Sequence, residues 1–318
     1  MNVDLLVSIL TVTIQAGTSL VFATIGEILT ERSGILNLGL EGIMIMGAVS
    51  AFAAAYHTES LLAGVAVAML VGAFLASIHA FLTISLRADQ VVTGLALTLF
   101  GVGLSSFLGQ NLGPGGKPLV GEVGPKFTKF AIPLLSEIPF LGAALFRQDP
   151  LVYVMYALVP AAAYFIYHTR PGLHLRAVGE SPATADAMGI SVSRTRYVYT
   201  LLGGMLMGLG GAHLSLAYTP GWTENLTGGR GWIAIALVIF ATWDPWRAVI
   251  GAVLFGGVNA IQFRLQAAGT TIPAAFLGML PYLFTIIVLV MITWLETFRT
   301  RVGAPAALGL PYVREERG

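Results

Sequence analysis

Long apolar runs constrain this chain more than any other feature of its sequence. About twenty consecutive apolar residues suffice for a helix to cross a bilayer. Only 10% of the 318 residues are charged, whereas about a quarter are charged in soluble domains. The sequence therefore predicts an all-α, polytopic integral membrane protein with about nine transmembrane helices, which form one transmembrane domain over residues 1–318. The runs are Leu5–Leu29, Gly34–Tyr56, Leu61–Leu86, Val91–Leu108, Leu151–Tyr167, Tyr197–Thr219, Gly231–Trp243, Ala248–Phe263 and Phe276–Leu295.

The basic residues predict how the chain is oriented. If nine spans alternate, 11 of the 17 Lys and Arg residues fall on one side, and basic loops mark the cytoplasmic side of a membrane protein. We therefore expect an external N-terminus, an extracytoplasmic loop at 110–150, a cytoplasmic loop at 170–196 and a cytoplasmic tail at 297–318. The residues on that side are Arg32, Arg87, Arg170, Arg176, Arg194, Arg196, Arg247, Arg299, Arg301, Arg314 and Arg317.

The loop at 170–196 contains start and stop signals for one very short helix. Ser181 suits the N-cap and Pro182 the first helical position, and Gly189 can close the helix in a left-handed conformation. So short an exposed helix has little to bury by itself, which favours docking against another protein over a plain loop. We assign to this docking element Gly179, Glu180, Ser181, Pro182, Ala185, Asp186, Met188 and Gly189.

The seventh apolar run is too short for an ordinary crossing. At 1.5 Å per residue, Gly231–Trp243 covers roughly two thirds of a hydrocarbon core. The segment before it, PGWTENLTGGRG, is polar and rich in glycine. A broken helix that lines a solute path has this pattern. A tilted or locally thinned span fits the pattern equally well.

Several polar side chains lie inside apolar runs. A carboxylate at membrane depth is costly, so it indicates function by default. Asn37 and Glu41 are four residues apart, hence on one face of a helix, where they line a polar pathway or form hydrogen bonds across helices. Glu27 is expected nearer the membrane interface. Asn259 and Gln262 lie three apart near the outer end of a late span, where they contact a polar solute or neighbouring helices.

The residue inventory excludes several classes of function. The chain has no cysteine, which excludes disulfides and thiolate metal sites. His79 and His213 have no second ligand at a suitable spacing, so we expect no metal site. No phosphate-binding loop pattern occurs, and no catalytic constellation of Ser, His and acid is present. We predict a non-catalytic chain that binds no cofactor, and the net charge of +1 argues against nucleic acid as a partner.

Four stretches together resemble the permease subunits of bacterial ABC importers for branched-chain amino acids, ribose and nucleosides, especially the simple-sugar and nucleoside permeases. The stretches are GILNLGLEGIMIMGA, RAVGESPATADAMGISVSRTR, GRGWIAIALVIFATWDPWRAVIGAVLFGG and the tail APAALGLPYVRE. They run from Gly34 to Glu315, nearly the whole chain. The resemblance implies a fold like that of type II ABC importers. It also implies that Gly179 to Ile190 is the coupling helix that seats in a groove of an ATPase subunit.

The same resemblance implies the partners. ATP and Mg²⁺ would bind to an ABC ATPase subunit, and a small polar solute, a nucleoside or a simple sugar, would cross between two permease subunits, identical or related. An extracytoplasmic solute-binding lipoprotein would deliver it, and the complex would lie among the lipids of the bacterial cytoplasmic (inner) membrane. The alternative is an ion-driven secondary transporter in which Glu41 or Glu27 carries a proton. The docking helix favours the importer.

Overall fold

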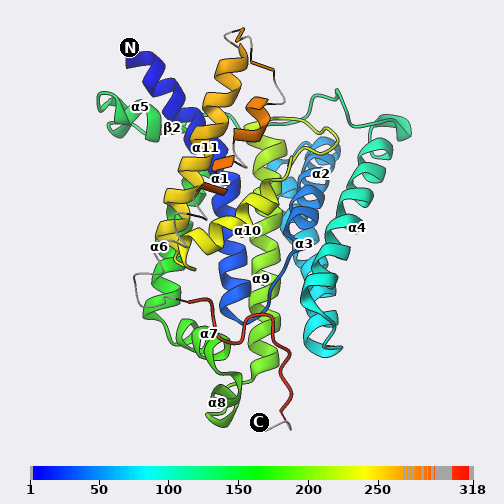
Figure 1. Ribbon diagram of the computed structural model, residues 1–318. Helices are drawn as coiled ribbons and strands as arrows, with labels where there is room; N and C mark the ends of the chain where they lie inside the picture. Colours follow the sequence, from blue (N-terminus) through cyan, green and yellow to red (C-terminus); the bar gives the residue numbers. More distant parts are fainter. Residues whose placement is uncertain are drawn as a thin grey trace.

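A computed structural model describes residues 3–267 and 303–314 and some of the residues between 269 and 290 (Figure 1). Within these residues, seven helices are long and apolar enough to cross a membrane. They confirm an all-α polytopic membrane protein. They are α1 (Val3–Arg32), α2 (Leu40–Thr58), α3 (Leu61–Ala80) with the π-helical η1 (Phe81–Ser85), α4 (Gln90–Asn111), α6 (Pro150–His168), α9 (Val192–His213) with the π-helical η4 (Leu214–Tyr218), and α11 (Pro245–Ala267).

The predicted number of nine crossings is an approximation. The seven helices correspond to the first six apolar runs and the eighth. The seventh run forms only the short α10 (Arg230–Ala241), and half of the ninth run, Phe276–Leu295, lies outside the described residues.

The other elements are short and lie at the two ends of the bundle. Between α4 and α6 are η2 (Pro114–Gly116), η3 (Leu135–Glu137), α5 (Leu141–Leu145) and an antiparallel pair of strands, β1 (Phe130–Ala131) and β2 (Arg147–Gln148). In Figure 1, α5 and β2 lie at the end that holds the N-terminus. At the opposite end lie α7 (Arg170–Glu180) and α8 (Pro182–Ala187), beside the C-terminus. We call these the N-terminal end and the α8 end.

Close helix packing in the core depends on glycine. At Gly26 an added Cβ would lie 2.6 Å from the carbonyl oxygen of Gly203, and at Gly47 it would lie 2.6 Å from that of Gly208. These contacts bring α1 and α2 against α9, which runs through the middle of the bundle (Figure 1). Membrane bundles use small residues in this way because backbones can then approach closely.

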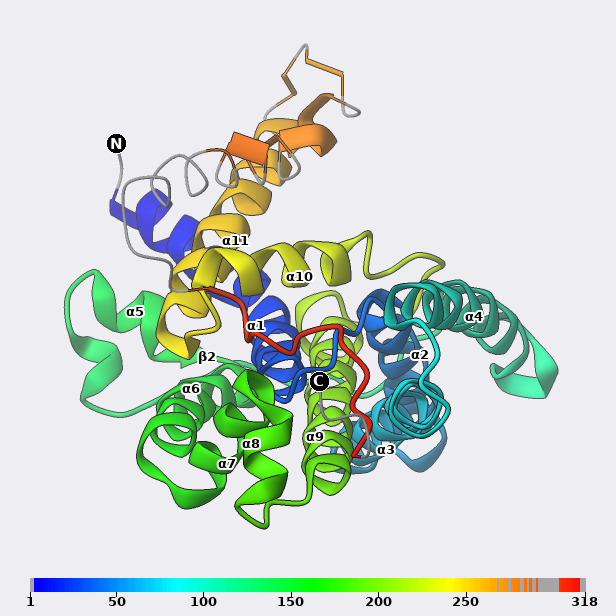
Figure 2. The same ribbon diagram turned by 60° about the horizontal axis from the view of Figure 1, so that its bottom comes forward.

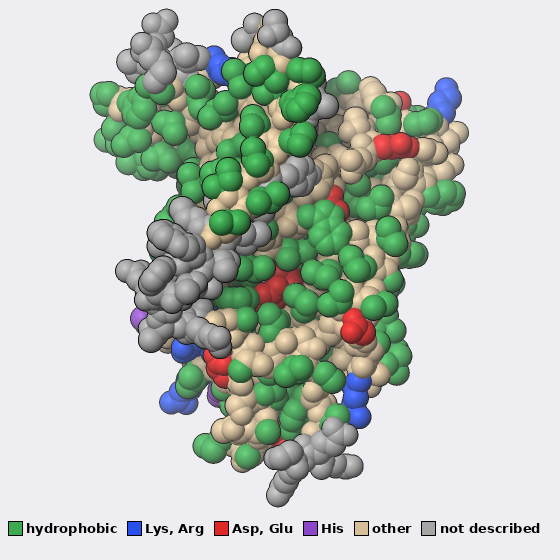
Figure 3. Space-filling model, viewed as in Figure 1, with side chains coloured by type: hydrophobic (Ala, Val, Ile, Leu, Met, Phe, Trp, Pro, Cys, Tyr) green, Lys and Arg blue, Asp and Glu red, His purple; other side chains and the backbone are tan. Residues whose placement is uncertain are grey.

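One face of the molecule is largely apolar between ends that carry basic side chains. Figure 3 shows hydrophobic side chains over most of this face, with Lys and Arg side chains toward its top and bottom. Large apolar side chains such as Leu62, Phe74, Leu99 and Phe107 are more than half exposed. Such a belt matches the hydrocarbon layer of a bilayer, flanked by charged side chains that reach water.

Candidate functional site

Residues 33–39 form an irregular, mostly buried segment between α1 and α2. Figure 1 shows this trace rising from the α8 end of α1 to the start of α2. We predicted helix from Gly34, but α2 begins only at Leu40. Asn37 therefore does not share a helical face with Glu41, and this prediction was wrong. We refer to residues 33–39 as the irregular segment.

Buried side chains satisfy the backbone N–H groups of the irregular segment. Leu36 N donates to Gln90 Oε1 at 2.7 Å, and Asn37 N donates to Glu27 Oε1 at 3.0 Å. Gly39 N donates to the side-chain oxygen of Asn37 at 2.9 Å. Non-helical backbone at membrane depth is tolerated only where such partners replace water.

The carbonyl groups of the irregular segment have partners from three other helices. His79 Nε2 donates to the Leu36 carbonyl at 3.0 Å, which fixes the proton of this histidine on Nε2. Thr98 Oγ1 donates to the Leu38 carbonyl at 2.8 Å, and Arg196 Nε donates to the Ser33 carbonyl at 3.2 Å. His79 is thus a core histidine, as expected from its lone position in an apolar run.

Glu41 joins the start of α2 to the start of α10. Its carboxylate accepts hydrogen bonds from Thr227 Oγ1 at 2.5 Å, Gly229 N at 3.0 Å and Gly231 N at 2.6 Å. A carboxylate at a helix N-terminus is stabilised by the free N–H groups and the helix dipole. Only 4% of Glu41 is exposed. The sequence left open whether Glu41 lines a pathway or bonds across helices, and the structure shows the second arrangement.

The short α10 completes a broken crossing. Its twelve residues make a helix about 18 Å long at 1.5 Å per residue. An irregular loop, residues 219–229, leads into it, and its first turn packs on Glu41. Of the two alternatives that the sequence left open for this run, the structure favours the broken helix.

Two further acids of α1 are buried near the irregular segment. The position of Glu27 near the membrane interface stays a prediction, and its side chain is wholly buried among helices. One turn later, Glu31 accepts a hydrogen bond from Trp243 Nε1 at 2.5 Å. These acids connect α1 to the irregular segment and to the turn after α10. Sequence reasoning missed Glu31, although its i+4 spacing from Glu27 was a usable signal.

The structure does not bring Asn259 and Gln262 to Glu41. Asn259 Nδ2 donates to the Phe255 carbonyl of its own helix at 3.3 Å. Both side chains are half-buried in the later part of α11. No hydrogen bond joins either of them to Asn37 or Glu41 in the described part of the chain. The four candidate pathway residues thus form two separate groups, one at the start of α2 and one in α11.

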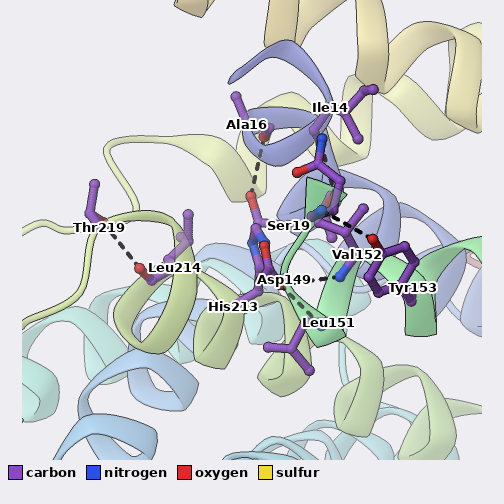
Figure 4. A network of polar contacts seen from close by, with 12 residues as sticks. Ile14, Ala16, Ser19, Asp149, Leu151, Val152, Tyr153, His213, Leu214 and Thr219 are labelled. Atoms are coloured by element: carbon purple, nitrogen blue, oxygen red, sulfur yellow. Dashed lines mark hydrogen bonds and ion pairs between the residues drawn. The ribbon is translucent and has the colours of Figure 1, made fainter. Parts of the chain in front are cut away.

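Asp149 and His213 form a buried polar pair, shown in Figure 4. Asp149 Oδ1 caps α6 by accepting from Leu151 N at 3.0 Å and Val152 N at 3.2 Å, and Asp149 Oδ2 lies 3.9 Å from His213 Nε2. Burial raises the pKa of Asp149, but His213 and the two backbone N–H groups outweigh it, so the pKa lies below its usual range. The sequence hid this pair because 64 residues separate its members. The described residues contain no cluster of three metal-ligating side chains.

At the α8 end, two helices form a compact projection (Figures 1 and 2). In α8, Ser181 Oγ accepts from Thr184 N at 3.4 Å, Pro182 occupies the first turn, and Gly189 follows with φ +83°. The predicted short helix is therefore confirmed. The preceding α7 was not predicted, although Thr169 caps it by accepting from Gly172 N at 3.1 Å.

The projection has an inner and an outer face. Ala185, 3% exposed, packs inward against Val178 and Val192. We assigned Ala185 to the docking element, but its side chain supports α8 from within and offers nothing to a partner. Outward lie Met188, 78% exposed, and Ala183, Thr184 and Ala187. We call these four residues the α8 outer face.

Gly179 and Glu180 hold the base of this projection. A Cβ at Gly179 would overlap the carbonyl oxygen of Arg32, so glycine lets α7 pack on the end of α1. The Glu180 carboxylate accepts from Ala306 N at 3.1 Å. Both residues therefore connect α7 to neighbouring parts of the chain.

A polar groove of about 350 Å³ lies beside α8 and the start of α9. Asp186 Oδ2 accepts from Arg314 Nε at 3.1 Å in its wall. Burial and the neighbouring Asp186 carboxylate raise the pKa of Tyr312, which keeps its phenol uncharged. Other residues that line the groove are Arg87, Gly189, Ser191 and Ser193.

The apolar belt, the broken crossing at α10 and the exposed projection define a polytopic membrane protein. The chain belongs to the family described as branched-chain amino acid transport system / permease component, which matches residues 8–294.

Three curated relatives cover nearly the full length of the chain. A putative glucose ABC transporter permease protein, TsgC13 of Haloferax volcanii, is 39% identical, with 96% of this chain and 98% of that protein aligned. The nucleoside ABC transporter permease protein NupC of Lactococcus lactis is 36% identical, with 94% of each chain aligned. The guanosine ABC transporter permease protein NupQ of Bacillus subtilis is 33% identical, with 99% of each chain aligned. The expected membership of an ABC permease family is confirmed.

Proposed function

We propose that this chain is the permease subunit of an ATP-driven importer and forms half of the path for a nucleoside or a simple sugar. The names of the aligned relatives support this class of solute. The α8 outer face supports the proposed coupling to an ATPase subunit, because it exposes apolar and small side chains on a capped helix. It is the surface to which an ATPase subunit would bind.

The proposal includes three protein partners and an orientation. An ATPase subunit binds ATP and Mg²⁺, a second permease subunit completes the path, and an extracytoplasmic lipoprotein delivers the solute. The α8 end faces the cytoplasm and the N-terminal end faces outward in the bacterial inner membrane. The basic residues at the α8 end, such as Arg170, Arg176 and Arg194, support this orientation.

The place where α10 meets α2 is the part of the chain that we put beside the solute. The short α10 begins inside the bundle against the first turn of α2, as broken helices do at the binding sites of other transporters. We give Asn37 and Glu41 the role of positioning the starts of α2 and α10, because their side-chain oxygens accept backbone hydrogen bonds. Asn259 and Gln262 stay candidates for direct contact with solute.

A negative charge added to the α8 outer face tests the docking role. In vesicles that contain all subunits, Met188→Glu should reduce co-purification of the ATPase subunit at least tenfold and abolish ATP-driven uptake. The matched control is His174→Glu, which adds the same charge to an exposed position of α7. Undiminished uptake by Met188→Glu would contradict the proposal.

Vesicles that contain this chain alone separate the importer from an ion-driven transporter. We expect no uptake of guanosine or glucose when a pH gradient is imposed. Uptake under that gradient, lost in Glu27→Gln, would refute the ATP-driven mechanism.

A further inference from the structure

The C-terminal tail, residues 303–314, lies along the α8 end and is tied to both helices of the projection (Figure 2). Ala307 N donates to the Gly179 carbonyl of α7 at 2.9 Å. Ala306 N donates to the carboxylate of Glu180 at 3.1 Å. Farther along, the Arg314 side chain pairs with Asp186 of α8. Three contacts thus fasten one stretch of tail to α7 and α8.

The same tail also contacts the irregular segment. Gly309 N donates to the Gly34 carbonyl at 3.2 Å. Gly34 has φ +91°, and a Cβ there would lie 3.2 Å from the Ala307 carbonyl oxygen and 2.9 Å from an Arg196 side-chain nitrogen. The backbone conformation and the close approach of the tail therefore both require glycine at position 34.

Arg196, which belongs to α9, links the tail to the irregular segment. Its side chain is 1% exposed. Its Nε donates to the Ser33 carbonyl at 3.2 Å, and its Nη1 donates to the Leu310 carbonyl at 3.1 Å. One guanidinium therefore holds the start of the irregular segment and the tail together. No acid pairs with Arg196 among the described residues, so these carbonyls are its only hydrogen-bond partners there.

We infer that Arg196 and the tail are positioning elements that fasten the irregular segment to α7 and α8. The connection runs from Asp186 through Arg314 and the tail to Arg196, and from there to Ser33 and Gly34. The irregular segment leads directly into α2, where Glu41 holds the first turn of α10. A displacement of α8 would thereby reach α2 and the broken crossing at α10 through continuous hydrogen-bonded contacts. The inference rests on the proposed function for the source of that displacement.

The ratio of solute transported to ATP hydrolysed measures how well Arg196 and the tail pass a displacement of α8 to the irregular segment. In vesicles with all subunits, deletion of residues 303–318 and Arg196→Gln should each lower that ratio at least fivefold while the ATPase subunit still co-purifies. Arg196→Lys should recover part of the loss, because an ammonium group can still donate to one of the two carbonyls. The control is Arg194→Gln, an exposed arginine two residues away in α9.

The combined variant tests whether Arg196 and the tail act through one connection. If they do, Arg196→Gln should add less than twofold to the effect of the deletion, since coupled residues are not additive. A wild-type ratio in both single variants would overturn the inference. So would loss of the ATPase subunit from the deletion variant, because the tail would then be a docking contact.

Hydrogen exchange tests, without ATP or solute, whether the tail stabilises the irregular segment. The purified complex lacking residues 303–318 should exchange the amides of residues 33–39 at least tenfold faster than the full chain, while amides in the middle of α9 keep their rates. Unchanged exchange at 33–39 would overturn the inference even if transport falls. If the full chain shows the protected segment but no ATP-driven uptake, the proposed function fails and the connection stands.

A cross-link between the tail and α7 tests the same inference without removing the tail. Because the chain has no cysteine, Glu180→Cys with Ala306→Cys supplies a unique pair that a short bis-methanethiosulfonate reagent can join through reducible disulfides, with methanesulfinate as the leaving group. We expect the joined protein to keep at least half of its uptake per ATP, since tail and α7 move together. Loss of transport that reduction of the link restores would contradict this, because the tail would then have to detach.

Discussion

The carboxylate of Glu41 lies 2.6 Å from the backbone nitrogen of Gly231, although 190 residues separate them in the sequence. This contact joins the first turn of α2 to the first turn of the short α10 inside an apolar bundle. An interior carboxylate with three hydrogen-bond donors serves as a structural clamp. The donors are neutral, so the clamp depends on oriented N–H groups and on the hydroxyl of Thr227.

Glu41→Gln should weaken this clamp. The amide NH₂ group cannot accept a hydrogen bond, so at least one buried N–H group loses its partner, at a cost of about 1–3 kcal/mol. We expect a lower melting temperature in detergent and reduced uptake. The control is Glu224→Gln, which changes an exposed carboxylate that accepts from Ser106 and Gln110. Equal melting temperatures for the two variants would contradict the structural role.

Gly231→Ala should be more severe than its size suggests. A Cβ at this position would overlap the Cα of Glu41, and neither backbone can give way without moving a helix. Overpacking of this kind costs about 1–3 kcal/mol or more. We expect little protein in the membrane fraction, measured by immunoblot. The matched control is Gly103→Ala, because an added Cβ there meets open space.

Ser181→Ala should loosen α8 without affecting the bundle. The lost N-cap hydrogen bond is worth about 1 kcal/mol, which matters in a helix of six residues. We expect uptake per ATP to fall two- to fivefold while the melting temperature stays within about 1 °C. Ser191→Ala is the control, because Ser191 occupies the N-cap of α9 without a side-chain bond. A similar loss of uptake in both variants would argue against a specific role for α8.

Acid should destabilise the protein partly through Asp149. Because its pKa is lowered by folding, its charge stabilises the fold above the ordinary carboxyl range, and this contribution is lost as the pH falls through the lowered pKa. Asp149→Asn keeps a capping oxygen but removes the charge beside His213. The melting temperature of the wild type should exceed that of the variant at pH 7, and the difference should shrink steadily below pH 4. A constant difference would show that the charge contributes nothing.

The helices that depend on local patterns were predictable. Apolar runs located the seven long helices, and Ser181, Pro182 and Gly189 marked α8. The irregular segment was not predictable, because GILNLG is apolar enough to continue a helix. Its backbone is held open by side chains from distant helices, such as Gln90 and His79, and this information is not local.

The candidate site was predictable in composition and less so in arrangement. Glu41 stood out as an acid within an apolar run, but its donors lie at least 186 residues away. The inward packing of Ala185 depends on Val178 and Val192, which flank α8 in the chain. The tail offered little beyond Arg314 as a signal, since its contacts use backbone atoms of Ala306, Ala307 and Gly309.

The pairing of Arg314 with Asp186 has a practical meaning for anyone who labels this protein. Four residues separate Arg314 from a reporter fused after Gly318, and Arg314 lies against α8. A bulky domain on a short linker would compete for the same space as the proposed ATPase subunit. A fusion before residue 1 begins at the N-terminal end of the bundle and leaves the space beside α8 clear.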